Sequence, residues 1–206
     1  GTIKINGRDL ESNAVDVKKM IGYLPEGAPS YGDMTVISFM KFIGEIRGYK
    51  GDELAERINY VLGLVDLQGV TSQVIETLSK GYKRRVGLAQ AIIHDPQILL
   101  LDEPTDGLDP NQKQQVRSLI KSLSKDKIVI ISTHILEEVT SVCTRAVIIS
   151  QGEIVADGTP AELESKSRYH NAVTIQLLRP YDISEDLLEL SEKLSIEKIE
   201  NSLGYC

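Results

Sequence analysis

Apolar positions along this chain follow two spacings that alternate in a regular order. Compact apolar stretches predict strands at residues 21–24, 97–102, 127–132 and 145–150. Apolar residues that recur about every 3.6 positions predict helices at residues 36–47, 52–62, 80–93, 110–124 and 135–143. Strands separated by helices in this rhythm indicate parallel βαβ crossovers, whose ligands bind at the carboxyl ends of the strands.

Turn signals predict further structure on both sides of this alternating part. An Asn-Gly pair at residues 6–7 follows the alternating residues 2–5 and is typical of a two-residue hairpin. A Gln-Gly pair at residues 151–152 turns the chain back into a strand at 153–157. Residues 159–162 have the pattern of a helix capping box, with proline at the first helical position.

The sequence becomes polar and turn-like around residues 165–171. Beyond this stretch, alternation over 173–177, helical spacing over 184–194 and a weaker strand near Ile196 predict a small β-α-β unit that breaks off unfinished. We therefore expect a main α/β domain followed by a small C-terminal α+β appendage.

Charge and cysteine content narrow the possible functions. The net charge of −7 argues against a broad nucleic-acid-binding surface, which needs a basic face. The basic run Lys83, Arg84 and Arg85 is therefore interpreted as a solvated helix face. Cys143 and Cys206 share no metal-binding or redox spacing, and Cys143 is expected to be a small core residue in a helix. No apolar run approaches the ~20 residues that span a bilayer.

Two adjacent carboxylates, Asp102 and Glu103, follow the apolar strand at 97–102. Such a strand delivers them to the carboxyl edge of the sheet, where phosphates and Mg²⁺ gather. Asp102 suits a hard cation that keeps several waters, and Glu103 can orient or deprotonate a water that attacks a γ-phosphate. The alternative is a carboxylate that only caps the next helix.

Two helix starts carry candidate polar groups. Ser79 and Gly81 lie at the start of the helix at 80–93, where free N–H groups and the helix dipole favour an anion. Asp109 precedes Pro110 and has the pattern of an N-cap with proline at the first helical position. An ordinary N-cap is the alternative interpretation of Ser79 as well.

His134 follows the strand at 127–132, where it can donate to a γ-phosphate and hold the attacking water in line. Taken singly, it is a histidine at a helix N-terminus, but its place beside Glu103 favours a catalytic role. His94 and His170 have no such company: His94 ends a helix, where a cation is favourable, and His170 lies in the polar stretch.

Taken in order, these motifs resemble those of the ATP-binding cassette (ABC) ATPases over roughly residues 1–160. The Q-loop, signature, Walker B, D-loop and switch histidine are matched by Glu26, Ser79, Asp102 with Glu103, Asp109 and His134. The resemblance implies a P-loop NTPase-like parallel sheet with a helical signature subdomain. It places a partial ABC ATPase domain over 1–164, with the helical subdomain at about 34–94, and the appendage over 165–206.

No G-x-x-x-x-G-K-[ST] phosphate loop occurs in the 206 residues. Residues 1–7 resemble the family's strand that follows the phosphate-loop helix, so the loop and the adenine-stacking aromatic residue are expected upstream of Gly1. The chain as printed is expected to bind ATP weakly and to hydrolyse little of it by itself.

In this family two cassettes pair head to tail, and each ATP lies between the phosphate loop of one cassette and the signature of the other. The resemblance thus makes Glu103 and His134 catalytic, and Asp102 and Glu26 ligands of Mg²⁺. The residues implied to bind the nucleotide are Ser79, Lys80, Gly81, Tyr82 and Asp109. The implied partners are a second cassette and an integral membrane permease, with no nucleic acid, and the implied location is the cytoplasmic face of the cell membrane.

Two departures from the family pattern indicate a branch. Glu26 stands where the family usually has glutamine, and its carboxylate would repel a nearby γ-phosphate unless a metal intervenes. The signature reads Leu-Ser-Lys-Gly-Tyr at residues 78–82. Both variants resemble the ATPase subunits of bacterial multidrug and ABC-2-type exporters.

Two alternatives stay open. One is a soluble ABC ATPase acting on DNA or the ribosome. The interval from Glu26 to Ser79 is short and lacks the sustained heptads of a coiled coil, which disfavours the DNA-acting relatives. The chain shows one cassette, whereas ribosomal relatives usually carry two. A non-catalytic cassette that acts as a partner or regulatory module would account for the absent phosphate loop. The retained Asp102, Glu103 and His134 argue against it.

Overall fold

The computed structural model describes residues 1–27 and 31–166. Gly1–Ser165 forms one compact unit, and a second unit covers Lys166–Cys206. The strand at 173–177, the helix at 184–194 and the strand near Ile196 were predicted for this second part and lie outside the described residues, as do His170 and Cys206.

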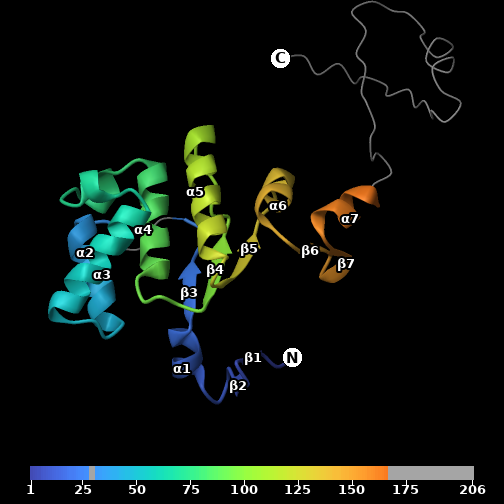
Figure 1. Ribbon diagram of the computed structural model, residues 1–206, viewed down its shortest axis with the longest axis horizontal. Coiled ribbons are helices and arrows are strands. Elements are labelled where there is room, and N and C mark those ends of the chain that lie inside the picture. The colour runs from blue at the N-terminus through green and yellow to red at the C-terminus, as the bar shows by residue number, and fades with distance from the viewer. Residues whose placement is uncertain (28–30, 167–206) are drawn as a thin grey trace, which may run out of the picture. The chain divides into compact units, whose positions relative to one another are not determined.

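A three-stranded parallel sheet organises the main unit (Figure 1). Its strand order follows the chain and consists of β3 (Ile21–Leu24), β4 (Ile98–Asp102) and β5 (Ile128–Ser132). The register pairs Ile21 with Ile98 and Ile98 with Ile128, so that Asp102 lies opposite Ser132 at the carboxyl edge. The parallel strands predicted from the three apolar stretches are confirmed.

One face of this sheet is covered by α4 (Lys80–Ile92) and α5 (Pro110–Leu123). Leu99 and Leu101 of β4 join a buried cluster with side chains of both helices. The approach of α4 to β3 requires glycine, because a Cβ on Gly22 would lie 2.0 Å from the Ala91 carbonyl oxygen. On the other face, Tyr23 and Ile130 stay about half exposed.

The segment between β3 and α4 contains α2 (Val36–Ile46), α3 (Gly51–Leu64) and the short 3₁₀ turns η1 (Gln68–Val70) and η2 (Ile75–Thr77). Thr35 caps α2, because its hydroxyl accepts the Ser38 N–H at 3.2 Å. Gly48, at φ 98°, adopts the left-handed conformation that ends this helix. Apolar residues of α2 and α3 face the common core.

The start of the chain forms the predicted hairpin. β1 (Lys4–Ile5) pairs antiparallel with β2 (Arg8–Asp9), and Asn6 and Gly7 both have positive φ, as a two-residue turn of this kind requires. α1 (Ala14–Lys19) follows and was not predicted. It is one short helix with a single buried residue, Val17, so it leaves almost no periodic signal.

The last described elements are α6 (Leu136–Val142), β6 (Ala146–Ser150), β7 (Glu153–Gly158) and α7 (Pro160–Ser165). The predicted hairpin and capping box are confirmed: Thr159 N–H donates to Glu162 Oε2 at 2.8 Å, and Glu162 N–H donates to Thr159 Oγ1 at 3.3 Å. The expectation that residues 145–150 continue the parallel crossovers is wrong. β6 pairs antiparallel with β7 and stands apart from the three-stranded sheet.

Three side chains differ from their sequence-based interpretation. Arg84 and Arg85 are buried, at 6% and 8% exposure, and therefore do not form a solvated helix face. Cys143 caps the C-terminal end of α6 and is half-buried, so it is not a core residue within a helix. Burial raises the pKa of its thiol. Within residues 1–27 and 31–166, no helix is long and apolar enough to cross a membrane.

Candidate active site

The carboxyl ends of β4 and β5 bring Glu103 and His134 together. Asp102 is the last residue of β4 and pairs with Ser132, the last residue of β5. The next backbone N–H, that of Glu103, donates to the Ser132 carbonyl at 3.0 Å. Glu103 itself has φ 46°, a conformation uncommon outside glycine, which turns its side chain away from the strand direction.

The Glu103 carboxylate accepts several hydrogen bonds from the segment that follows β5. Its Oε1 accepts the His134 backbone N–H at 3.1 Å and lies 2.8 Å from His134 Nδ1. Its Oε2 accepts the Thr133 hydroxyl at 3.5 Å. This carboxylate raises the pKa of His134, first by the hydrogen bond and then by its charge.

Exposure separates the roles of the two side chains. The Glu103 side chain is 19% exposed, whereas the His134 side chain is 74% exposed. Because Nδ1 faces the carboxylate, it carries the proton, and Nε2 is presented to solvent. The arrangement can polarise a water near Glu103 and donate to an anion near His134.

Asp102 offers a carboxylate oxygen beside the pair. The Ser132 hydroxyl donates to Asp102 Oδ1, which leaves Oδ2 for another partner. No group of three or more histidine, cysteine or carboxylate side chains that could enclose a metal occurs in the described part of the chain. The Asp102 carboxylate is a hard oxygen donor, which suits a hard cation that keeps waters and takes phosphate oxygens as its remaining ligands.

Arg84 of α4 lies under the loop that carries Glu26. Its Nη1 donates to the Pro25 carbonyl at 2.8 Å and to the Gly27 carbonyl at 3.1 Å, the two residues that flank Glu26. The same guanidinium donates to carbonyl oxygens of the turn after β4, which belong to Asp102, Glu103 and Pro104. The loop that carries the exposed Glu26 and the Asp102–Glu103 turn are thus hydrogen-bonded to the same buried guanidinium.

Burial is the largest influence on the Arg84 guanidinium and lowers its pKa. Four carboxylates oppose this effect, namely those of Asp106, Asp102, Glu103 and Glu26. Sequence reasoning missed this residue, although a signal was present. Arg84 shares a helical stripe with the buried Leu88 and Ile92, at i, i+4 and i+8, which predicts an inward-facing position.

A second buried contact holds the turn after Glu103. The Thr105 hydroxyl donates to the Glu138 carboxylate of α6, and the two residues are 1% and 2% exposed. α6 begins just after His134, so this contact ties the two sides of the candidate site together. It was not predicted from the sequence.

The predicted anion-binding residues gather at the starts of α4 and α5. Ser79 caps α4 and accepts the Tyr82 N–H at 3.4 Å, and Asp109 caps α5 and accepts the Gln112 N–H at 3.0 Å. A Cβ on Gly81 would lie 2.2 Å from Gln112 Oε1, so the two helix starts are in contact.

Lys80 belongs to the same region, since its Cδ lies 3.5 Å from the position of a Cβ on Gly107. The N-cap interpretation of Ser79 and Asp109 is confirmed. No hydrogen bond or ion pair among residues 1–27 and 31–166 joins these N-terminal groups to Glu103 or His134.

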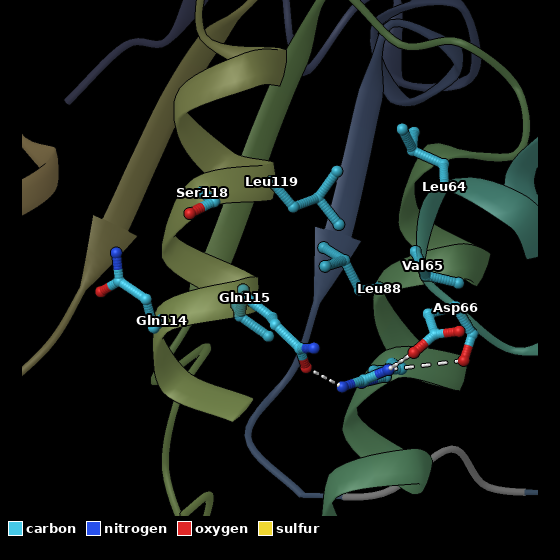
Figure 2. A pocket seen from close by; sticks show the side chains of 10 residues that line it. Leu64, Val65, Asp66, Leu88, Gln114, Gln115, Ser118 and Leu119 are labelled. Carbon is cyan, nitrogen blue, oxygen red and sulfur yellow. Dashed lines mark hydrogen bonds and ion pairs between the residues drawn. The ribbon is translucent and has the colours of Figure 1, made fainter. Parts of the chain in front are cut away.

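A groove of about 390 Å³ opens between α4, α5 and the end of α3 (Figure 2). Arg85 lines it and donates to Asp66 Oδ2, at 2.9 Å, and to Gln115 Oε1. None of the predicted site residues lines this groove. The candidate chemistry lies instead at the carboxyl edge of the sheet.

His94 differs from its predicted role as a cation at a helix end. It lies beyond α4, and its Nε2 contacts the Ile21 carbonyl oxygen at 3.0 Å. Burial and the nearby Arg47 lower its pKa to about 4. The imidazole is therefore neutral at physiological pH.

Comparison with known proteins identifies the family. A family model described as ABC transporter matches residues 1–106. The ABC transporter ATP-binding protein MJ1023 of Methanocaldococcus jannaschii is 36% identical over 184 residues, which cover 87% of this chain and 70% of that protein. This chain belongs to the ABC transporter family.

Other relatives of the cassette agree. The linearmycin resistance ATP-binding protein LnrL of Bacillus subtilis is 34% identical over 167 residues, covering 81% of this chain and 54% of that protein. A solved structure described as the ATP-binding subunit of an ABC transporter has a TM-score of 0.71 at 26% identity, covering 81% of this chain and 70% of that chain. The fold is that of an ABC ATP-binding subunit.

This chain spans only part of the length of the curated relatives that it matches. It spans 21% of ABC transporter A family member 1 of Dictyostelium discoideum, at 31% identity over 183 residues. It spans 55% of the ATP-binding protein YxlF of Bacillus subtilis, at 36% identity over 168 residues.

Proposed function

We propose that this ABC cassette belongs to an ATP-hydrolysing subunit that drives an exporter. The observation that carries the proposal is the Glu103–His134 pair. A largely covered carboxylate at the end of one parallel strand is held by the backbone and ring of a histidine that follows the next strand. This is the arrangement that an in-line attack of water on a γ-phosphate needs.

In this proposal Glu103 orients and polarises the attacking water. His134 acts in its protonated form, in which Glu103 holds Nδ1–H and Nε2–H is donated to the γ-phosphate. Asp102 would hold Mg²⁺ through its free carboxylate oxygen, and Glu26 would add a second, water-mediated contact. Bound Mg²⁺ supplies positive charge that offsets the phosphate oxygens and the Glu26 carboxylate.

The signature-like residues serve a second cassette in this proposal. Ser79, Lys80, Gly81 and Tyr82 would meet the γ-phosphate of the nucleotide held by the partner, and Asp109 would support the contact between the two sites. The place of these residues at the starts of α4 and α5, where free N–H groups favour an anion, supports this assignment. The helical subdomain would be residues 34–94 of a domain covering 1–164.

Export is favoured by the names of several relatives. These include linearmycin resistance protein LnrL, Nod factor export ATP-binding protein I of Cupriavidus metallidurans and the probable multidrug protein YbhF of Escherichia coli. We propose that the cassette likewise acts at the cytoplasmic face of a membrane, bound to a permease, as a homo- or heterodimer.

The test is Glu103→Gln in the full-length protein. We expect ATP hydrolysis to fall about 10²- to 10⁴-fold, because the amide cannot polarise the water, while Mg-ATP still drives dimerisation in size-exclusion chromatography. Glu153→Gln, an exposed isosteric change on β7, is the matched control and keeps both properties. Unchanged hydrolysis in Glu103→Gln would remove Glu103 from the mechanism.

A non-catalytic cassette that only completes the site of a partner is the second candidate. It predicts hydrolysis at background level in the wild-type protein, with no further loss in Glu103→Gln. It also predicts that the chain stimulates hydrolysis when a partner cassette is added, because Ser79 would still complete the partner's site.

A further inference from the structure

Arg84 is the only described arginine whose guanidinium donates to the loops on both sides of the candidate site. Its first set of acceptors comes from the loop after β3, at Pro25 and Gly27. Its second set comes from the turn after β4. An arginine offers five N–H donors in a rigid fork, and here all three of its nitrogens have carbonyl partners.

The acceptors are backbone carbonyl oxygens, so the contact fixes main chain and not a single side chain. The residues concerned flank Glu26 or include Glu103 itself, and Glu103 is held at φ 46°. A backbone that departs from ordinary strand conformation persists only when its surroundings determine it. Arg84, at 6% exposure, is a rigid support for both segments.

We infer that Arg84 is a positioning residue that fastens the Glu26 loop and the Glu103 turn to the signature helix α4. The expected effect of Arg84 on turnover rests on the proposed function, whereas its role in fixing the two segments does not. Any displacement of α4 is passed to both loops through one guanidinium. The fork geometry, and not the charge alone, is required, because one ammonium cannot reach two sets of carbonyls.

Arg85 supplies a matched control on the same helix. It is equally buried, at 8% exposure, but its guanidinium contacts Asp66 and Gln115, away from both loops. Arg84→Gln and Arg85→Gln therefore remove the same group from adjacent positions of α4. Any difference between them in the two loops reports the carbonyl contacts and not the loss of a buried arginine.

The first readout is ¹⁵N relaxation of the Gly27 and Glu103 amides in the full-length protein. In Arg84→Gln both order parameters are expected to fall together, from about 0.85 to below about 0.6, while Arg85→Gln leaves them unchanged. Arg84→Lys, which keeps the charge, is expected to leave at least one loop loose. If Arg84→Gln does not fold, Arg84→Lys carries the comparison. Order parameters equal to wild type in the folded variant would overturn the inference.

The second readout is turnover. Arg84→Gln is expected to lower kcat about 100-fold, with KM for ATP within about twofold of wild type. Arg84→Lys is expected to keep a kcat below about a tenth of the wild-type value. Glu103→Gln separates the two ideas. If Glu103→Gln abolishes hydrolysis while Arg84→Gln keeps wild-type kcat, only the Arg84 inference fails. If both keep wild-type kcat, the proposed function fails, and the relaxation result decides on Arg84.

Discussion

Glu103 Oε1 accepts the backbone N–H of His134 at 3.1 Å and lies 2.8 Å from the Nδ1 atom of the same residue. A single carboxylate oxygen therefore fixes both the main chain and the ring of the histidine. The ring is oriented by a group that is itself held by β5, through the Glu103 N–H bond to Ser132. Rotation of the imidazole would break one of these contacts.

This pairing predicts a raised pKa for the His134 imidazole. The Glu103 carboxylate stabilises the protonated ring, so the NMR titration midpoint is expected above the ordinary value of about 6.5. Glu103→Gln should return it toward 6.5. Because the folded pKa is the higher one, the contribution to stability is complete below about pH 6.5 and disappears as the pH rises through the folded pKa. A midpoint in the wild type at or below that of the variant would contradict the pairing.

Ser79 allows its cap and its proposed anion site to be separated. Ser79→Ala removes the hydroxyl that accepts the Tyr82 N–H, and is expected to lower the free energy of unfolding by about 1 kcal/mol in urea denaturation. Ser79→Asp keeps a cap and should unfold within about 0.5 kcal/mol of wild type. Its carboxylate would repel a phosphate, so ATP-driven dimerisation should be lost. Dimerisation of Ser79→Asp at the wild-type nucleotide concentration would argue against a phosphate at this helix start.

His94 predicts a pH dependence of stability of the opposite sign to that of His134, because its pKa is lowered on folding. Its folded pKa of about 4 lies below the unfolded value, so the unfolded state binds the proton first as the pH falls. Its contribution is complete above about pH 6.5 and is lost between 6.5 and 4. Urea denaturation should show a steeper loss in this window for wild type than for His94→Gln, whose amide can still donate to the Ile21 carbonyl. Equal slopes would mean that burial does not keep His94 neutral.

Much of the fold could be predicted from the sequence because its signals are local. The strand before Asp102, the cap formed by Asp109 and the Asn-Gly turn each depend on neighbouring residues only. The placement of Glu103 beside His134 also follows, since parallel strands with short connections align their carboxyl ends.

Two of the wrong predictions, those for Arg84 and His94, concern partners that are distant in the chain. Arg84 was interpreted as solvated because its acceptors, Pro25 and Glu103 among them, belong to two other segments. His94 is neutral because burial and then the nearby Arg47 lower its pKa, and neither is visible in its helix-end position. β6 has the apolar pattern of a sheet strand, but its pairing is decided by the adjacent Gln-Gly turn.

The most direct test of the account is a double-mutant cycle on Glu103 and His134, measured as kcat for ATP hydrolysis by the full-length protein. Groups that act as one unit lose activity once, so Glu103→Gln, His134→Ala and the double variant should have kcat values within about tenfold of one another. If the double variant instead loses the product of the two single losses, the residues act independently. That result would contradict the catalytic pair on which the account rests.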